Sequence, residues 1–102
     1  MDKAEALKIA GKYLSIIKSK YNVQNALLFG SFAKGTNHID SDIDLAIVIN
    51  NSNDIIDTQI ELLKLRRKVD LRIEPHPFTS MDFNKNNPVV NEILKYGIVI
   101  EL

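Results

Sequence analysis

The sequence predicts an α/β (α+β) fold, with one small mixed β-sheet and flanking helices in a single domain over residues 1–102. Three observations lead to this prediction. Helical and strand patterns follow one another along the chain without an internal repeat or a linker. A chain of 102 residues has room for one hydrophobic core. Its 45% hydrophobic and 25% charged residues are typical of a globular protein, which excludes a disordered or low-complexity chain.

The first half of the chain predicts a helix, a strand, a short turn and a second strand. Apolar residues first recur at spacings of three and four, as on one face of a helix, until Asn22 ends the pattern. A short apolar run bounded by Gly30 then predicts a buried strand. One helical turn and a polar loop lead to a strand whose far end is apolar on both faces. These elements cover residues 7–21, 26–29, 31–34, 35–41 and 43–49.

The second half predicts two more helices and two more strands. A cap-forming cluster at residues 50–53 precedes a helical pattern that ends in positive charge, which the helix dipole favours at that end. The next strand carries Asp70, Arg72 and Glu74 on one face, and the Pro-His-Pro sequence at residues 75–77 stops it. An Asn-Pro pair opens the last helix and a glycine closes it. These helices and strands cover residues 56–68, 69–74, 88–96 and 98–100.

The charge balance and the absence of cysteine exclude several classes of function. Thirteen basic residues balance thirteen acidic ones, so we expect no direct binding to nucleic acid or to a membrane surface. The chain has no cysteine, which excludes disulfides, thiolate catalysis and thiolate zinc sites. The start of the chain is polar, and no apolar run is long enough for a signal sequence or a membrane span. We therefore predict a cytoplasmic protein.

The histidines and the basic cluster have structural interpretations. We expect His38 to be a solvated side chain in the polar loop and His76, between two prolines, to be a turn residue. The two histidines fit no zinc spacing, so a metal here would be held by carboxylates, which favours a hard cation such as Mg²⁺. The basic residues 66–68 complement the C-terminus of a helix and have no interleaved aromatic residues to stack nucleic acid bases.

A Gly-Ser turn follows the first predicted strand. Gly30 and Ser31 place backbone N–H groups and a hydroxyl at the N-terminus of a helical turn, which suits a phosphate oxygen. Glycine also lets an anion approach the backbone closely. By itself, a Gly-Ser turn after a strand is more often only a turn. A Walker-type phosphate loop is excluded because no Gly-Lys-Ser/Thr sequence follows.

Asp42 and Asp44 stand two residues apart at the start of the second predicted strand. A period of two places both carboxylates on one face, with Cβ atoms about 6–7 Å apart, close enough to share a cation. Asp70, on the next predicted strand, is the expected third member, whereas we expect Glu74 to face solvent. Three converging carboxylates repel one another unless cations bind or protons are taken up. Taken alone, the aspartate pair is equally consistent with a solvated strand end.

The two motifs occur together as Gly-Ser, ten intervening residues and Asp-x-Asp leading into an apolar strand. This combination resembles the signature of the DNA polymerase beta-like nucleotidyltransferase superfamily, and more narrowly that of the minimal nucleotidyltransferases. The resemblance covers residues 30–74 by motif and nearly the full chain by length and element order. It implies a nucleotidyltransferase fold and the transfer of a nucleoside monophosphate from ATP or another triphosphate to a hydroxyl group.

The resemblance implies a nucleotide-binding role for residues in and after the Gly-Ser turn. Gly30 and Ser31 would hold the terminal phosphates, with Lys34 beside them, and Ser41, directly before the aspartate pair, is a further candidate. Many minimal nucleotidyltransferases carry arginines in this turn. Here Phe32 and Lys34 occupy those positions, which leaves one cation to meet phosphate.

The resemblance also implies a metal site made of three carboxylates. Asp42 and Asp44 would bind two Mg²⁺ ions, and Asp70 would complete the site near the acceptor hydroxyl. We prefer Asp70 to Glu74 because an arginine follows it two residues later, as in the polymerases. Arg72 would pair with Asp44 or Asp70 and hold it in place, or would simply neutralise the polar face of the strand.

The acceptor is expected to come from outside the chain. The 102 residues leave no segment for an acceptor-binding domain, so we expect the acceptor to sit against a second subunit in a homo-oligomer or to be brought by a partner. Proteins that resemble this one are often paired with a helical toxin of the HEPN type, a ribonuclease. Some of them neutralise it by transferring AMP to its tyrosine, so the resemblance implies an antitoxin of this kind.

Three alternatives stay open at this point. The first is nucleotidyl transfer to a small hydroxylated molecule, as in the related antibiotic-modifying enzymes. The second is an antitoxin that binds its partner without catalysis. The third is a metal-free domain that keeps the fold without activity, which the intact set of carboxylates argues against.

Overall fold

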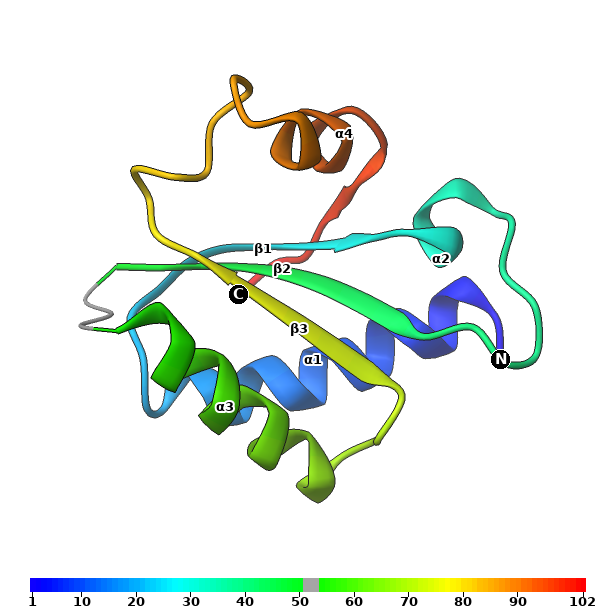
Figure 1. Ribbon diagram of the computed structural model, residues 1–102. Coiled ribbons are helices and arrows are strands. Elements are labelled where there is room, and N and C mark those ends of the chain that lie inside the picture. The colour runs from blue at the N-terminus through cyan, green and yellow to red at the C-terminus, as the bar shows by residue number, and fades with distance from the viewer. Residues whose placement is uncertain (51–53) are drawn as a thin grey trace.

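The computed structural model describes residues 1–50 and 54–102. Figure 1 shows helices on both sides of a single sheet. The chain order alternates between the two kinds of element, as the sequence predicts. The elements are α1 (Lys3–Lys18), β1 (Val23–Phe29), α2 (Ser31–Lys34), β2 (Ile43–Ile49), α3 (Ile55–Leu65), the 3₁₀ turn η1 (Arg66–Lys68), β3 (Ile73–Phe78), α4 (Pro88–Tyr96) and β4 (Ile98–Val99).

The sheet is mixed and has the strand order β3-β2-β1-β4. β1 runs antiparallel to both of its neighbours, β2 and β4, whereas β2 and β3 are parallel. Parallel strands need a crossover connection, and α3 provides it here. The mixed sheet with flanking helices confirms the fold class that the sequence predicts.

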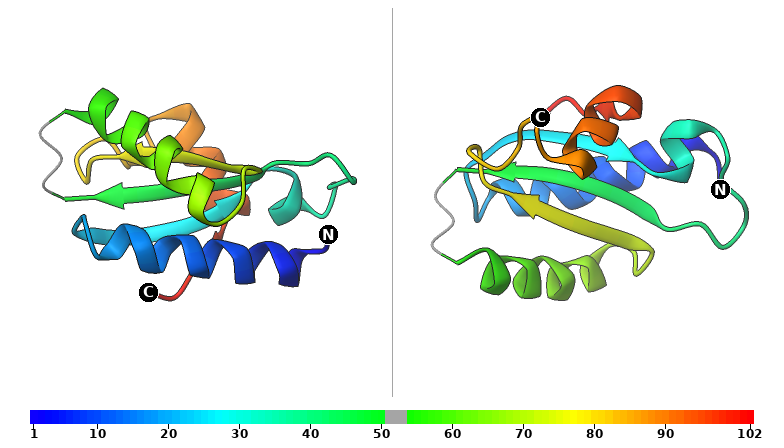
Figure 2. Two further views of the ribbon diagram at one scale, coloured as in Figure 1. Left: turned by 90° about the horizontal axis from the view of Figure 1, so that it is seen from below. Right: turned by 45° about the horizontal axis from the view of Figure 1, so that its top comes forward.

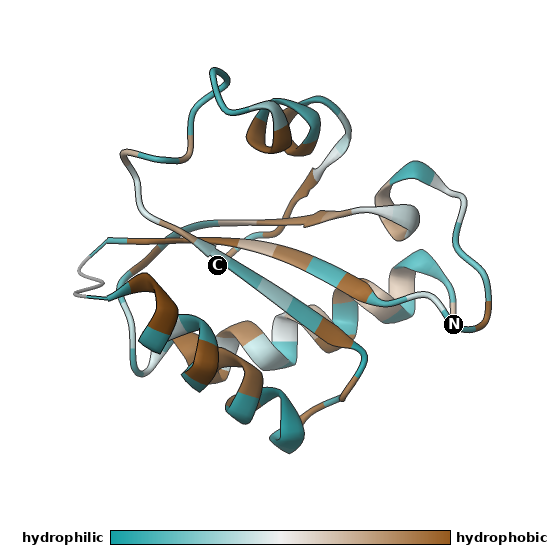
Figure 3. Ribbon diagram, viewed as in Figure 1, coloured by the Kyte–Doolittle hydropathy of each residue, from teal (hydrophilic) through white to brown (hydrophobic). Residues whose placement is uncertain are grey.

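The helices cover the two faces of the sheet unequally. α1 and α3 lie on one face and α4 lies on the other, as the two views in Figure 2 show. The larger core fills the space between the sheet and the α1/α3 pair. On the other face, Ile93 of α4 packs in a smaller cluster with Leu27 and Ala46 of the sheet. Figure 3 shows apolar residues along much of β2 and apolar residues alternating with polar ones along α1 and α3. No helix in the described part of the chain is long and apolar enough to cross a bilayer.

β2 is buried on both faces over most of its length. Its odd-numbered residues from Ile43 to Ile49 join the larger core, whereas Ala46 joins the cluster under α4. Asp44 lies between Ile43 and Leu45, so the alternation of the strand directs it to the α4 face. β2 therefore presents an acidic side chain at its N-terminal end on the face that α4 only partly covers.

The first helix and the first strand differ from the prediction at their shared boundary. α1 ends at Lys18 rather than at Asn22, and β1 begins at Val23, three residues earlier than predicted. Polar residues at this end of β1 interrupt the apolar pattern, so the pattern does not predict where the strand begins. β1 is nevertheless paired there, because Val23 and Asn25 lie opposite Ile49 and Val48 of β2.

The strand predicted at residues 69–74 is confirmed only at residues 73–74, because β3 covers Ile73–Phe78. Residues 69–72 form the turn that follows η1, in which the Asp70 N–H bonds to the Arg66 carbonyl. Pro75 and Pro77, which were expected to stop the strand, lie within it. An edge strand tolerates proline because its outward N–H groups need no partner, and β3 is an edge strand of this sheet.

The caps of the later helices follow from single polar side chains. The Asp54 carboxylate accepts hydrogen bonds from the N–H groups of Ile56 and Asp57 and begins α3. Of the predicted cap cluster at 50–53, residues 51–53 lie outside the described residues. The prediction for α4 is confirmed, since Asn87 caps the helix and Pro88 is its first residue.

Removal of the Tyr13 hydroxyl should destabilise the contact between α1 and α3. Tyr13 is fully buried, and its hydroxyl donates a 2.7 Å hydrogen bond to the Leu62 carbonyl. We expect Tyr13→Phe to lower the free energy of unfolding by about 1 kcal/mol, as measured by urea denaturation. Tyr96→Phe is the matched control, because Tyr96 is 46% exposed and should give a change close to zero. Equal effects of the two substitutions would contradict this account.

Candidate active site

The Gly-Ser turn and the aspartate motif meet where β1 ends and β2 begins. In the antiparallel register Phe29 lies opposite Asp44, so the turn that follows Phe29 is adjacent to the Asp44 side chain. Gly30 has φ 72° and ψ −151°, a conformation that side chains with a Cβ rarely adopt. A Cβ atom on Gly30 would lie 2.3 Å from Oδ2 of Asp44. Glycine is therefore required both by the backbone and by the carboxylate beside it.

The short helix α2 begins directly after this glycine. It consists of one turn, Ser31–Lys34, and its residue Phe32 is fully buried. Gly35 ends it in the left-handed conformation, with φ 76°. The first N–H groups of a helical turn have no partner within the helix, so they are available to an anion beside Gly30. The sequence prediction of one helical turn over residues 31–34 is confirmed.

The two aspartates of the motif lie at the N-terminal end of β2. Asp42 directly precedes the strand and is exposed. The Asp44 side chain is 27% exposed and lies between the Gly30 turn and β3. The structure therefore brings Asp44 together with the Gly-Ser turn, as the sequence predicts, although the two are fourteen positions apart in the chain (44 against 30).

The structure places Asp70 differently from the prediction. Because β3 begins only at Ile73, Asp70 lies in a turn and is not directed by strand alternation to the face of Asp44. Its two carboxylate oxygens accept hydrogen bonds of 2.9 and 2.7 Å from the Arg72 guanidinium, and Oδ1 also accepts one from the Arg72 N–H. These hydrogen bonds lower the pKa of Asp70. Of the roles that the sequence suggested for Arg72, the structure shows the ion pair with Asp70.

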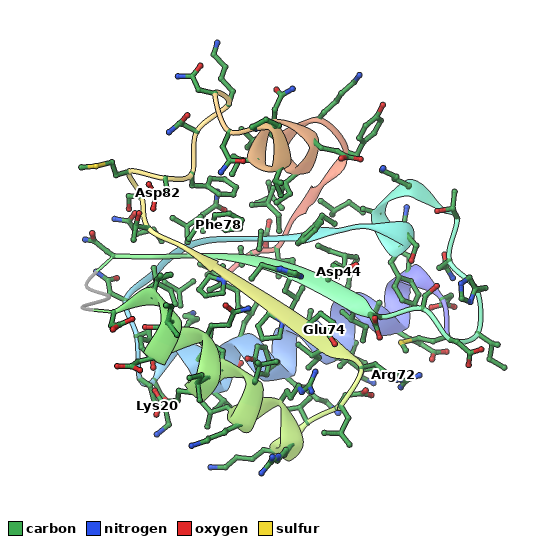
Figure 4. The ribbon with its side chains drawn as sticks, in the orientation of Figure 1. Lys20, Asp44, Arg72, Glu74, Phe78 and Asp82 are labelled. Carbon is green, nitrogen blue, oxygen red and sulfur yellow. The ribbon has the colours of Figure 1, made fainter. Side chains whose placement is uncertain are left out.

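Glu74 is the carboxylate that β3 places next to Asp44. The two residues are register partners in the parallel β2–β3 pair, so their side chains project from the same face. Figure 4 shows Asp44 on β2 and Glu74 near the start of β3. The Glu74 side chain is 39% exposed, and its Oε1 lies 3.2 Å from the Arg66 guanidinium. Within residues 1–50 and 54–102, no three His, Asp or Glu side chains are arranged to hold a metal by themselves.

A cleft of about 200 Å³ opens between α4 and the Gly30 turn. Lys34 crosses it, forming an ion pair with Glu92 of α4 and placing its ammonium 5.1 Å from the centre of the Tyr96 ring. The hydrogen bond to Glu92 raises the pKa of Lys34. Lys34 is thus near the turn, as predicted, but its charge is balanced by a residue of α4. The cleft is lined by Phe29, Gly30, Lys34, Val89, Glu92, Ile93 and Tyr96.

Ser41 and His38 hold the loop that precedes the aspartates. Ser41 is 6% exposed, and its hydroxyl oxygen accepts a 2.8 Å hydrogen bond from the His38 N–H. The hydroxyl thus closes the loop, and its proton is still available to a second partner, so a contact of Ser41 with a nucleotide stays a prediction. The His38 side chain is exposed, as the sequence predicts for a residue of the polar loop.

Sequence reasoning missed residues that the fold brings to the site. His76, expected in a turn, lies in β3 with its Nε2 atom 3.4 Å from Oδ1 of Asp44. The signal for it was the even spacing from Glu74, which predicts a shared strand face once the strand is extended through the prolines. Glu92 and Tyr96 reach the cleft only because α4 packs over β1, and no local pattern indicates this contact.

A comparison with models of protein families identifies the family of this chain. The family model described as polymerase beta nucleotidyltransferase matches residues 12–101. The chain belongs to this nucleotidyltransferase family. Gly30, Ser31, Asp42 and Asp44 all lie within the matched residues, so the motif and the family model agree on the same part of the chain.

One curated relative and two solved structures are similar to this chain. The relative is named "Putative protein adenylyltransferase MJ1379", from Methanocaldococcus jannaschii, and is 38% identical over 50 residues. Those residues are 49% of this chain and 50% of the relative, so the match spans about half of its length.

The solved structures share the fold. A nucleotidyltransferase structure from Sulfolobus solfataricus, described as putative, superimposes with a TM-score of 0.68 at 19% identity, over 95% of this chain and 80% of that one. A structure described as a toxin-antitoxin with AMP-PNP gives 0.66 at 24% identity, over 93% and 72%. The nucleotidyltransferase fold is thereby confirmed.

The donor atoms at this site fit a magnesium ion shared with a nucleotide. Asp42 and Asp44 supply carboxylate oxygens, which hard cations prefer. Mg²⁺ in proteins is commonly held by one or two carboxylates together with substrate phosphates and water, not by a cage of protein ligands.

Substitutions of the two positive-φ glycines should separate backbone strain from contact with Asp44. Gly30→Ala introduces a Cβ that collides with Oδ2 of Asp44, and its backbone strain costs about 1–3 kcal/mol. Gly35→Ala costs about 1–2 kcal/mol in the left-handed region, with open space around the new atom. We expect both variants to lose stability in urea denaturation, but only Gly30→Ala to lose nucleotide binding in calorimetry. Retained binding by Gly30→Ala would contradict the close approach.

The Asp70–Arg72 pair should add stability above the titration range of Asp70. The pKa of Asp70 is lowered below its ordinary value of 3.8, so the contribution is fully present above that value. It is lost as the pH falls through the lowered pKa. We expect Asp70→Asn to be less stable than wild type at about pH 7 in urea denaturation, and the difference to shrink as the pH falls below 3.8. A difference that stays constant with pH would show that the pair does not contribute.

Proposed function

We propose that this protein is a Mg²⁺-dependent nucleotidyltransferase that transfers AMP from ATP to a hydroxyl group of a partner protein. The observation that carries the proposal is the contact between Asp44 and the Gly30 turn. A carboxylate that can hold a metal and a turn that can hold phosphate are thereby adjacent. This is the arrangement that nucleotidyl transfer requires, because the metal and the triphosphate must meet at one phosphorus atom.

The proposed reaction exchanges a phosphoanhydride bond of ATP for a phosphate ester bond to the acceptor. The acceptor hydroxyl oxygen attacks the α-phosphorus of ATP in line with the leaving group. The new bond joins that oxygen to the α-phosphorus, and the bond between the α-phosphorus and the oxygen bridging to the β-phosphate breaks. Pyrophosphate leaves with the electron pair, and the hydroxyl proton passes to water. Positioning and charge stabilisation account for most of the catalysis in reactions of this type.

Each part of the site has a role in this reaction. Asp42 and Asp44 would hold the metal, and Gly30 and Ser31 would orient the terminal phosphates through backbone N–H groups and a hydroxyl. When bound, Mg²⁺ would lower the pKa of the acceptor hydroxyl and neutralise charge on the leaving pyrophosphate. Lys34 would have to exchange Glu92 for a phosphate oxygen. That exchange costs little, because an ion pair between exposed side chains contributes little to stability.

The third carboxylate of the site is proposed to be Glu74. It is the register partner of Asp44, whereas Asp70 lies in a turn and gives both of its oxygens to Arg72. Glu74 is bonded through a single oxygen to Arg66, and this leaves the other oxygen for a ligand. The sequence-based preference for Asp70 rested on the arginine that follows it and on a strand starting at residue 69, whereas β3 begins at Ile73.

The proposed acceptor is a tyrosine of a HEPN-type toxin, which makes the protein an antitoxin. Two similarities support the partner class. The curated relative is named as a protein adenylyltransferase, and one structure with the same fold is described as a toxin-antitoxin with AMP-PNP. The HEPN class and the tyrosine rest on the sequence resemblance to minimal nucleotidyltransferases.

Intact-mass measurement should test activity and acceptor together. The protein is incubated with Mg²⁺, ATP and the product of the neighbouring gene, and we expect the partner to gain the mass of one AMP group. Asp44→Asn should abolish the increase, because it weakens the hold on the metal at the centre of the site. His38→Gln is a matched control on the exposed loop and should keep full activity.

Other outcomes of the same experiment identify the alternatives. An unmodified partner together with an adenylylated small hydroxylated compound would point to a small-molecule enzyme. Neutralisation of the toxin that survives Asp44→Asn would indicate a module that acts by binding alone.

Paired substitutions should identify the third carboxylate. We expect Glu74→Gln to lower kcat by about 10-fold to 100-fold, the range seen for residues that support a metal site. We expect Asp70→Asn to change kcat less than about 3-fold while losing stability at neutral pH through its pair with Arg72. The reverse pattern of kcat values in steady-state assays would restore Asp70 to the site.

A further inference from the structure

His76 contacts Asp44 although 32 positions separate them in the chain. The parallel register places His76 opposite Ala46, so its side chain projects onto the same sheet face as Asp44, one alternation further along the strands. Nε2 of His76 lies 3.4 Å from Oδ1 of Asp44. The imidazole and the carboxylate are both partly exposed, at 41% and 27% of their side-chain surface.

One ring contact and the following proline restrict the orientation of His76. The ring packs edge-to-face against Phe29, with centroids 5.1 Å apart and planes at 63°. Phe29 is itself the residue that precedes the Gly30 turn. The backbone is restrained as well, because Pro77 follows His76 and disfavours any helical conformation at that position.

Asp44 consequently has a different neighbour at each oxygen. Oδ2 faces Gly30, where a Cβ atom would lie 2.3 Å away, and Oδ1 faces His76. An ionised carboxylate can only accept hydrogen bonds, so the contact requires a proton on Nε2. A hydrogen bond to one oxygen restricts rotation of the carboxylate group. The other oxygen therefore stays directed at the Gly30 turn.

We propose that His76 is a positioning residue that holds Asp44 through Oδ1 and so orients the carboxylate toward a metal bound at the Gly30 turn. The inference rests on the proposed function, since it takes Asp44 as the metal ligand. Residues that hydrogen-bond to a metal ligand are commonly worth 10-fold to 100-fold in metal affinity or activity. His76 does not touch the reacting atoms in this role, and its N–H group is the part that matters.

The hydrogen bond can be tested without metal or nucleotide. A long-range ¹H–¹⁵N spectrum of the free protein, recorded well above the ordinary pKa of imidazole, reports which ring nitrogen carries the proton. We expect His76 to have its proton on Nε2, and its Nε2 signal to shift in Asp44→Ala while both nitrogens of His38 stay unchanged. A proton on Nδ1, or a His76 signal that does not respond to Asp44→Ala, would overturn the inference whatever the protein catalyses.

The positioning role can be tested by binding of Mn²⁺ with α,β-methylene-ATP, in which the bond to be broken is replaced. We expect His76→Gln, which keeps an N–H donor, to bind with nearly the wild-type Kd in calorimetry. His76→Leu should bind about 10-fold to 100-fold more weakly. The control Lys20→Leu, at an exposed position after α1, should bind as wild type does, and thermal denaturation should confirm that all variants are folded.

A double-mutant cycle separates positioning from a general loss of structure. If His76 acts through Asp44, His76→Leu should weaken binding no further once Asp44→Asn is present. Additive losses, or a His76→Leu variant within about 3-fold of the wild-type Kd, would overturn the inference while leaving the proposed function intact. Wild-type protein with no Asp44-dependent binding would overturn both.

Discussion

The antiparallel pairing of β1 with β2 is the constraint on which the rest of the site depends. It places Phe29 opposite Asp44, so that the chain leaves β1 directly beside the carboxylate that begins β2. Only glycine can follow at position 30, because its φ is positive and any Cβ would collide with Asp44. The ladder of main-chain hydrogen bonds thus decides how close the Gly-Ser turn and the Asp44 carboxylate come to one another.

Three basic side chains around the site form ion pairs with acidic ones. Lys34 of α2 pairs with Glu92 of α4, Arg66 pairs with Glu74 of β3, and Arg72 binds Asp70 within one turn. These contacts lie at or near the surface, where ion pairs contribute little to stability and can be exchanged. In the function proposed above, nucleotide phosphates would replace such partners without a change of fold.

The edge position of β3 explains both the error in the sequence prediction and the contact of His76 with Asp44. A proline in a central strand would remove a hydrogen bond between strands, so the Pro-His-Pro sequence predicts the end of a strand. At the edge, the prolines cost no ladder hydrogen bond and discourage pairing with another chain. The strand therefore continues to Phe78, and His76 and Glu74 lie on the face that carries Asp44.

The local pattern of the sequence determined the order of the elements, the buried strand β2, the caps of α4 and the joint presence of Gly-Ser and Asp-x-Asp. These features depend on residues close together in the chain, such as the alternation along β2 or the side chain of Asn87. Only the tertiary structure decided that Glu74 and His76 flank Asp44 and that Glu92 balances Lys34. Those contacts depend on strand register and helix docking, which are set by packing between segments distant in the chain and leave no periodic signal in it.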